Sequence, residues 1–194
     1  MPVKLRIQHL SRRNKLARAL WGVVWLLLYR PSPVPLHGWR RWLLRLFGAR
    51  IGKPAYLYPS ARIWAPWNLE MGNHSTLASG VDCYCVDRIK IGSFTTISQY
   101  SFVCTASHDY LDPAILHQPQ MPLVTAPITL GDRVWITADV FIAPGVTVGD
   151  GVVVLARSSV FTDLPCWIVA SGNPATIQKK RVLRPSPSVK EPSC

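Results

Sequence analysis

The feature that most constrains the fold is an aliphatic residue at every sixth position. Between residues 130 and 160 this spacing is unbroken, at Leu130, Ile136, Ile142, Val148, Val154 and Val160. It also occurs earlier, at Ile51, Leu57, Ile63 and Leu69 and at Ile91, Ile97 and Val103, with a weaker set two residues out of phase at Met71, Leu77, Cys83 and Ile89. Helices repeat about every 3.6 residues and strands about every two, so a period of six predicts neither. It predicts the turns of a parallel β-helix, with each aliphatic residue pointing inward and glycine after several of them allowing the corner.

Charge divides the chain into two parts. Residues 1–53 contain 12 of the 22 basic residues and no acidic residue, because Glu70 is the first acid. The remainder holds ten basic and ten acidic residues, so the net charge of +12 belongs to the N-terminal part. A protein that binds nucleic acid over its folded surface is basic throughout, which argues against nucleic acid as a partner. The distribution predicts a neutral folded body with a cationic N-terminal extension.

The basic extension, residues 1–49, contains two helical patterns. Residues 19–29 form an apolar run closed by Arg30, shorter than the roughly 20 residues that span a bilayer. From His37 to Phe47, apolar residues recur at three- and four-residue steps: we assign the apolar face to Trp39, Trp42, Leu43, Leu46 and Phe47, and the polar face to Arg40, Arg41 and Arg45. Two roles stay open: residues 1–47 contact a membrane that carries anionic lipid, or the helices cover the end of the next domain.

Longer segments resemble a known family. Residues 130–174, which begin LGDRVWITADVFIAPGVTVGDG, resemble the hexapeptide-repeat O-acetyltransferases. WAPWNLEMG (64–72), VDCYCV (81–86), TTISQYSFVCTASHDY (95–110) and RPSPVPLHGWRRWLLRLFGARIG (30–52) are similar to the colanic acid biosynthesis acetyltransferase group. The resemblance implies an all-β fold, a left-handed parallel β-helix over residues 50–182 with an N-terminal helical extension, assembled as a homotrimer with active sites between subunits. It also implies acetyl-CoA as co-substrate, no metal, and a saccharide acceptor of bacterial exopolysaccharide biosynthesis, lipid-linked or a nucleotide sugar.

The six-residue spacing breaks between Val103 and Leu130, which are 27 positions apart. Long loops in a compact repeat domain are usually functional or disordered. By the resemblance, this insertion (104–127) reaches a neighbouring subunit and carries the catalytic histidine, His108. A neutral imidazole can take the proton of a sugar hydroxyl as its oxygen attacks the acetyl thioester, and main-chain N–H groups can stabilise the oxyanion. We expect acceptor contacts from Asp82, Cys83, Tyr84, Asp109 and Tyr110, although Asp109 alternatively anchors the turn after His108.

The resemblance also places the cofactor. Acetyl-CoA is expected in a groove between adjacent coils, against Trp135, Ala138, Ala156, Phe161, Asn173 and Lys179. Small side chains at Ala138 and Ala156 would let the pantetheine approach the main chain. Lys179 begins a run of three cations, through Arg181, that either binds the phosphates of CoA or is a solvated charge run.

Two other functions stay open from the residues alone. A γ-class carbonic anhydrase shares the coil and needs three histidines around one zinc ion. A non-catalytic, membrane-tethered scaffold needs His108 to be incidental. The five cysteines include no C-x-x-C pair and favour reduced thiols. We therefore expect a cytoplasmic enzyme, peripheral at the inner face of the cytoplasmic membrane, with a flexible tail over residues 183–194.

Overall fold

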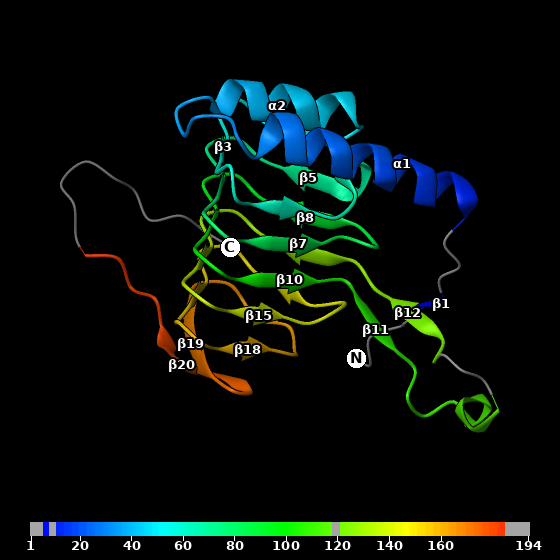
Figure 1. Cartoon of the computed structure of the whole chain (residues 1–194). Coiled ribbons are helices and arrows are strands. Elements are labelled where there is room, and N and C mark those ends of the chain that lie inside the picture. The colour runs from blue at the N-terminus through cyan, green and yellow to red at the C-terminus, as the bar shows by residue number, and fades with distance from the viewer. Residues whose placement is uncertain (1–5, 8–10, 118–120, 185–194) are drawn as a thin grey trace.

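The chain winds into a stack of coils whose strands form three parallel β-sheets around one core (Figure 1). Two helices lie across one end of this stack. The computed structural model describes residues 6–7, 11–117 and 121–184, with the main chain alone at residues 114 and 115. Residues 185–194 of the predicted tail, and residues 1–5 and 8–10 of the predicted extension, lie outside the described residues.

Each coil contributes one short strand to each sheet. The first sheet contains β2 (Arg50–Ile51), β5 (Leu69–Met71), β8 (Ile89–Ile91), β13 (Ile128–Leu130) and β16 (Thr147–Val148). The second sheet contains β3 (Tyr56–Leu57), β6 (Thr76–Leu77), β9 (Thr96–Ile97), β14 (Trp135–Ile136), β17 (Val153–Val154), β19 (Ile168–Gly172) and β20 (Ala175–Lys180). The third sheet contains β4 (Arg62–Ile63), β7 (Asp82–Tyr84), β10 (Phe102–Cys104), β15 (Phe141–Ile142) and β18 (Ser159–Val160). Within these three sheets, every pairing of the described strands is parallel except that of β19 with β20, which ends the second sheet as a hairpin.

The strand register brings the six-residue positions into three buried rows, which confirms the predicted coil. The rows are Ile51, Met71, Ile91, Leu130 and Val148; Leu57, Leu77, Ile97, Ile136, Val154 and Ala170; and Ile63, Cys83, Val103, Ile142 and Val160. Met71, Leu77 and Cys83 of the set out of phase form the second coil, because Met71 pairs with Ile51 from 20 positions earlier, whereas Val148 pairs with Leu130 from 18. Ile89, the last of that set, lies in the third coil, where it pairs with Leu69. The two extra residues lie at the corner after β4, which holds the 3-10 helix η2 (Pro66–Asn68).

Glycine follows an inward aliphatic residue because adjacent coils approach closely there. A Cβ added at Gly72 would lie 2.5 Å from the main-chain nitrogen of Ser93 in the next coil, a distance at which the main chain would have to move. Only glycine fits such an approach without displacing the backbone.

The helical cap consists of α1 (Arg12–Val24), a π-helical turn (Trp25–Tyr29) and α2 (His37–Leu46). In a parallel sheet, the main-chain carbonyls of a strand pair with the strands on either side of it. The first coil has no coil before it, so some of its carbonyls have no main-chain partner. Side-chain donors of the cap bind these carbonyls: Arg45 Nε to Ile51 O (3.1 Å), Arg41 Nη1 to Ala55 O (2.7 Å), Arg40 Nε to Leu57 O (2.6 Å), Trp25 Nε1 to Ala61 O (3.0 Å) and Trp21 Nε1 to Ile63 O (2.7 Å). The cap thus replaces the missing coil.

This arrangement corrects the predicted faces of α2. Arg40 was expected on the polar side but is fully buried, and its guanidinium also donates to Ser32 Oγ and Pro33 O, both at 2.8 Å. Burial lowers the pKa of Arg40, and burial raises the pKa of Tyr29, which lies beside it. The predicted apolar face is divided: Leu43 is buried against the coil, whereas Trp39, Trp42 and Leu46 are exposed. The coil end is a polar surface of carbonyls, so it attracts the arginine side of the helix.

The cap also exposes many apolar side chains, which we together call its outer face. It consists of the exposed residues Leu16, Leu20, Val23, Leu26, Leu27, Leu28, Val34, Leu36, Trp39, Trp42 and Leu46. Leu20 is 59% and Leu27 62% exposed, and the rings of Trp39 and Trp42 stack with centroids 5.1 Å apart. Within the described residues, no helix has both the length and the apolar character to cross a bilayer.

An arm projects from the side of the stack between β10 and β13 (Figure 1). It contains β11 (Ala106–His108), the 3-10 helix η3 (Pro113–Leu116) and β12 (Leu123–Thr125), and β11 pairs antiparallel with β12. Strand β1 (Arg6–Ile7) adds to the free edge of β12, so the start of the described chain is joined to this arm. The sequence contained no signal for that pairing.

The thiols follow the prediction in part. Cys83, Cys85 and Cys104 are free and buried. Cys166 takes part in a disulfide, so the expectation of reduced thiols is wrong for that residue.

Candidate functional site

His108 lies at the end of β11, exposed to solvent on the arm. Its Nδ1 lies 3.0 Å from the main-chain oxygen of Met121, across the β11–β12 hairpin. Because a carbonyl oxygen only accepts, Nδ1 carries the proton in the neutral ring, and Nε2 keeps its lone pair. The hairpin therefore holds the imidazole in the tautomer that a general base requires.

The residues after His108 shape the turn. Asp109 Oδ1 accepts from the main-chain N–H of Leu111 at 3.1 Å, and the Asp109 N–H donates to Pro122 O at 2.9 Å. These bonds support the anchoring role for Asp109. Tyr110 is exposed beside it.

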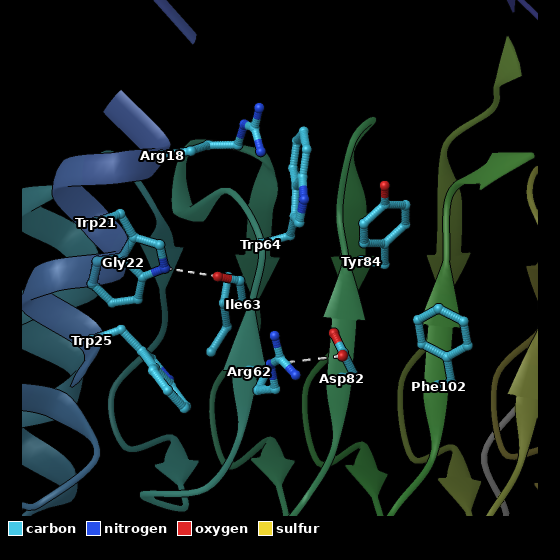
Figure 2. Close-up of a pocket in the computed structure, with 10 residues that line it drawn as sticks. All are labelled: Arg18, Trp21, Gly22, Trp25, Arg62, Ile63, Trp64, Asp82, Tyr84 and Phe102. Carbon is cyan, nitrogen blue, oxygen red and sulfur yellow. Dashed lines mark hydrogen bonds and ion pairs between the residues drawn. The ribbon is translucent and has the colours of Figure 1, made fainter. Parts of the chain in front are cut away.

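A cavity of about 440 Å³ lies between α1 and the third sheet; we call it the α1 pocket. Asp82 and Tyr84, two of the residues predicted to contact the acceptor, point into it from β7 (Figure 2). The sequence did not indicate the other lining residues, Arg18, Trp21, Gly22, Trp25, Arg62, Ile63, Trp64 and Phe102. Those from α1 meet the coil only through the tertiary fold, and no local signal could have found them.

The α1 pocket shifts the pKa of both Asp82 and Tyr84. Burial raises the pKa of Asp82, and Arg62, whose Nε lies 3.9 Å from Asp82 Oδ2, acts in the opposite direction. Burial also raises the pKa of Tyr84, and the nearby charge of Arg18 opposes that shift. A carboxylate and a phenol in a half-buried, aromatic-walled cavity suit hydrogen bonding to the hydroxyls of a sugar.

The predicted contact between Cys83 and the acceptor is wrong. Cys83 was expected to contact the acceptor between Asp82 and Tyr84, but it is fully buried in the interior row between Ile63 and Val103. Side chains alternate across a strand, so two neighbours that face the pocket force the residue between them into the core.

Three predicted cofactor residues lie along one edge of the coil, the corner between the second and third sheets. Ala138 and Ala156 occupy this corner in successive coils, where the Arg157 N–H donates to Ala138 O at 3.1 Å. Asn173 follows in the β19–β20 turn, where the Gly172 N–H donates to Ser158 Oγ at 3.1 Å. At Ala138 and Ala156 the side chain ends at Cβ, which is the small size that the predicted pantetheine groove requires.

The remaining predicted cofactor residues are dispersed. Trp135 is half exposed on β14, with its Nε1 donating to Ser98 Oγ at 3.0 Å. Phe161 follows β18 on the third sheet, with its ring centroid 5.7 Å from that of Phe141. Lys179 lies on β20, opposite Val169.

A second cavity, of about 400 Å³, brings Trp135 together with two arginines. It is lined by Arg133 and Arg181, with Phe94 and Trp167 among its walls. Arg181 Nη1 donates to Gly151 O at 2.7 Å and to Arg133 O at 3.1 Å, so its guanidinium is bonded to two successive coils. Arg181 belongs to the predicted cationic run, whereas Arg133 was not indicated by the sequence.

Among the described residues, no three His, Cys, Asp or Glu side chains are grouped to hold a metal ion. His108, His74 and His117 in particular do not converge there. The described part of the chain therefore does not form the three-histidine site that a γ-class carbonic anhydrase requires.

Curated proteins resemble this chain over much of its length. No family model matches the chain. WcaF of Escherichia coli (strain K12), a protein named for an acetyltransferase of colanic acid biosynthesis, is 44% identical over 170 residues, which cover 87% of this chain and 90% of WcaF. WbbJ of the same strain, named for a lipopolysaccharide biosynthesis O-acetyl transferase, is 31% identical over 121 residues, 58% of each chain.

Solved structures share the fold. A hexapeptide-repeat-containing acetyltransferase from Vibrio cholerae O1 biovar eltor, complexed with acetyl coenzyme A, has a TM-score of 0.78 and 26% identity, over 89% of this chain and 91% of that one. A maltose O-acetyltransferase from Clostridium difficile 630 has a TM-score of 0.77 and 26% identity, over 88% and 89%. The chain therefore belongs to the hexapeptide-repeat acetyltransferases, as an O-acetyltransferase of left-handed β-helix fold in the colanic acid biosynthesis group of WcaF.

Proposed function

We propose that the protein transfers an acetyl group from acetyl-CoA to a saccharide hydroxyl in bacterial exopolysaccharide biosynthesis, with His108 as general base. The observation that carries the assignment is the bond between His108 Nδ1 and Met121 O, which leaves Nε2 unprotonated and accessible on an exposed arm. The bound acetyl coenzyme A of the Vibrio cholerae relative supports the choice of donor.

In the proposed reaction, Nε2 of His108 takes the proton from the acceptor hydroxyl as that oxygen attacks the thioester carbonyl. The new C–O bond forms, and the tetrahedral intermediate collapses by breaking the C–S bond. The imidazolium returns its proton to the departing thiolate, which gives the O-acetyl ester and free CoA. The Met121 carbonyl stabilises the imidazolium through the Nδ1–H bond, in the way an orienting acceptor does in other His-based sites.

The acceptor saccharide is assigned to the α1 pocket, with Asp82 and Tyr84 binding its hydroxyls and with Asp109 and Tyr110 approaching from an arm. Acetyl-CoA is assigned to the coil edge at Ala138, Ala156 and Asn173, with Trp135, Phe161 and Lys179 beside it. His108 does not line the α1 pocket of its own chain. We infer a homotrimer in which the arm of one subunit completes the site of the next, so that residues 50–182 act as the catalytic domain.

We also infer peripheral contact with the inner face of the cytoplasmic membrane through residues 1–47. The outer face of the cap supports this, since it presents leucines and tryptophans to solvent while the chain contains no acidic residue before Glu70. An apolar helix surface in a cationic setting suits a bilayer with anionic lipid.

The test compares two histidine variants. His108→Ala should lower the rate of acetyl-CoA-dependent acetylation by about 10²- to 10⁴-fold, the range that a general base contributes. His117→Ala, an exposed histidine elsewhere in the arm, is the matched control and should retain the wild-type rate. Thiol release is measured with an acceptor panel of mono- and oligosaccharides, and equal turnover of His108→Ala and the wild type would overturn the assignment.

A further inference from the structure

The arm that carries His108 is joined to the coil at its base. There the Ala126 N–H donates to Thr105 O at 3.0 Å, and the Thr105 N–H donates to Tyr84 O at 3.2 Å. Beyond the base, β11 and β12 project together, and His108 stands opposite Leu123. A two-stranded hairpin is only marginally stable in water, so the position of His108 depends on what holds β12 in place.

Strand β1 adds a third strand to this hairpin. Arg6 pairs with Thr125 and Ile7 with Val124, the same two residues of β12 that pair with β11 on the other side. Strand β12 is therefore the central strand of the arm, with β1 beside it (Figure 1). The pairing covers an edge of β12 whose main-chain groups would otherwise lack strand partners.

The contribution of β1 comes from its main chain. Both of its side chains are exposed, that of Ile7 by 63%, whereas Val124 and Thr125 opposite them are buried. The pairing thus supplies hydrogen bonds between peptide groups and little apolar burial. This is also why no pattern of side chains in the sequence indicated it.

The register of β12 determines the setting of the His108 ring. Met121 O, which lies 3.0 Å from Nδ1, belongs to the segment that leads into β12. Pro122 O, next in that segment, accepts from the Asp109 N–H at 2.9 Å, and Leu123 then pairs with His108. A slip of one residue between β11 and β12 would remove Met121 O from the ring. A strand that fixes β12 therefore also fixes the imidazole.

We propose that β1 is a positioning element for His108. By pairing with β12 it keeps the arm in the register that sets Met121 O against Nδ1, and so leaves Nε2 free to act as a base. The use of the ring in acetyl transfer rests on the proposed function, whereas its setting by β1 does not. We assign β1 no contact with either substrate, since it acts through the arm.

Two proline variants test the main-chain pairing. Neighbouring residues of an antiparallel strand direct their N–H groups to opposite sides, so one of Arg6 and Ile7 donates toward β12 and the other points away from it. Proline lacks this N–H and is tolerated on an edge strand where the group faces solvent. Only one of Arg6→Pro and Ile7→Pro should therefore lower kcat, by about threefold to tenfold for one main-chain hydrogen bond, and the other is the matched control.

Two further variants separate main chain from side chain. Ile7→Ala should retain the wild-type rate, because it leaves the main-chain pairing intact. Removal of residues 1–7 should lower kcat at least as far as the more damaging proline does. The KM for acetyl-CoA and the thermal unfolding midpoint should stay at the wild-type values in all four variants, since neither Arg6 nor Ile7 lines either cavity or belongs to the core.

The readout specific to positioning is the tautomer of His108. Nitrogen NMR of the full chain with isotope-labelled histidine, at a pH where the ring is neutral, should show Nδ1 protonated in the wild type, and His108→Ala assigns the signal. The damaging proline and the removal of residues 1–7 should give a mixture of both tautomers, and the other proline should not. An unchanged tautomer after that removal, or equal behaviour of the two prolines, would overturn the proposal. A loss of unfolding midpoint shared by the variants would do so too.

The tautomer and the turnover distinguish this proposal from the proposed function. If His108→Ala turns over as the wild type does while the tautomer still depends on β1, the proposed reaction fails and the positioning of the ring stands. If His108→Ala is inactive but the tautomer and kcat are independent of β1, the general base stands and the positioning role fails.

Discussion

The coil body fills its core with aliphatic side chains, whereas the helical cap buries an arginine beside its leucines Leu43 and Leu44. In the body, aliphatic side chains fill the interior and polar residues face outward, as in the row from Leu57 to Ala170. In the cap, Arg40 is fully buried and Leu20 is 59% exposed. The difference arises because the body packs side chain on side chain, whereas the cap packs onto the open edge of a β-structure. A row of unpaired carbonyls selects donors rather than hydrocarbon.

The two ends of the stack also differ. The first coil is covered by side-chain donors from helices, whereas the last is followed by the β19–β20 hairpin, in which main chain pairs with main chain. Solenoid ends must be capped by something that satisfies the exposed edge. Here the helical solution leaves an apolar surface outside, which the proposed membrane contact uses.

The largest expected effect on stability comes from Arg40→Met. Removing the guanidinium abolishes its buried hydrogen bonds to Leu57 O, Ser32 Oγ and Pro33 O, which we expect to lower the free energy of unfolding by about 3 to 5 kcal/mol. Arg41→Met, a half-buried arginine with one carbonyl partner, should cost only about 1 kcal/mol. Urea denaturation measures both, and equal losses would mean that the cap is held by its leucines instead.

Replacing glycine by alanine should change stability in opposite directions in the body and in the cap. Gly151 has a φ of +66°, and an added Cβ would lie 2.6 Å from the Trp167 ring, so Gly151→Ala should destabilise the body by about 1 to 3 kcal/mol. Gly22 on α1 has no atom within 4 Å of the added Cβ, so Gly22→Ala should stabilise the cap by up to about 1 kcal/mol. Thermal unfolding of both variants is the measurement, and a destabilised Gly22→Ala would contradict the open space found beside Gly22.

The apolar outer face should matter for binding more than for folding. The double variant Leu20→Gln, Leu27→Gln should change the free energy of unfolding by no more than about 0.5 kcal/mol, since both side chains are exposed and glutamine favours helix comparably. Flotation with anionic vesicles should fall more than tenfold, because each leucine buried in lipid contributes about 1.5 to 3 kcal/mol. Ile177→Gln, an exposed aliphatic residue on β20, is the control and should float as the wild type does. Unchanged flotation of the double variant would remove the case for membrane contact.

The smallest effect concerns Asp82. Its pKa is raised in the folded protein, so the folded state binds the proton more tightly and stability falls as pH rises from the unfolded pKa through the folded one. Asp82→Asn removes this cost and should be equally or slightly more stable at neutral pH, by no more than about 0.5 kcal/mol because solvent screens the site. The difference should close below the unfolded pKa. Urea denaturation across pH tests this, and a variant that is less stable at neutral pH would mean that the Arg62 pair outweighs burial.

The coil is predictable from the sequence alone, because the six-residue spacing that indicates it is local and repeated. An aliphatic residue at every sixth position, often followed by glycine, packs inward only if the chain forms such a coil. The shift in spacing at Met71 corresponds to the longer corner after β4. The arm and His108 were predictable as the place where the spacing fails. The inward position of Cys83 was predictable in principle too, since the alternation of Asp82, Cys83 and Tyr84 along one strand requires it.

The side of each cap helix that faces the coil, and the set of residues that lines the α1 pocket, depend on contacts that form only in the folded protein. Helical spacing at Trp39, Arg40 and Leu43 identifies faces but does not say what surface each will meet. The answer depends on carbonyls of Ile51 to Ile63, whose missing partners exist only once the coil has formed. The same long-range contact brings Arg18 over Trp64, 46 positions away, in the lining of the α1 pocket.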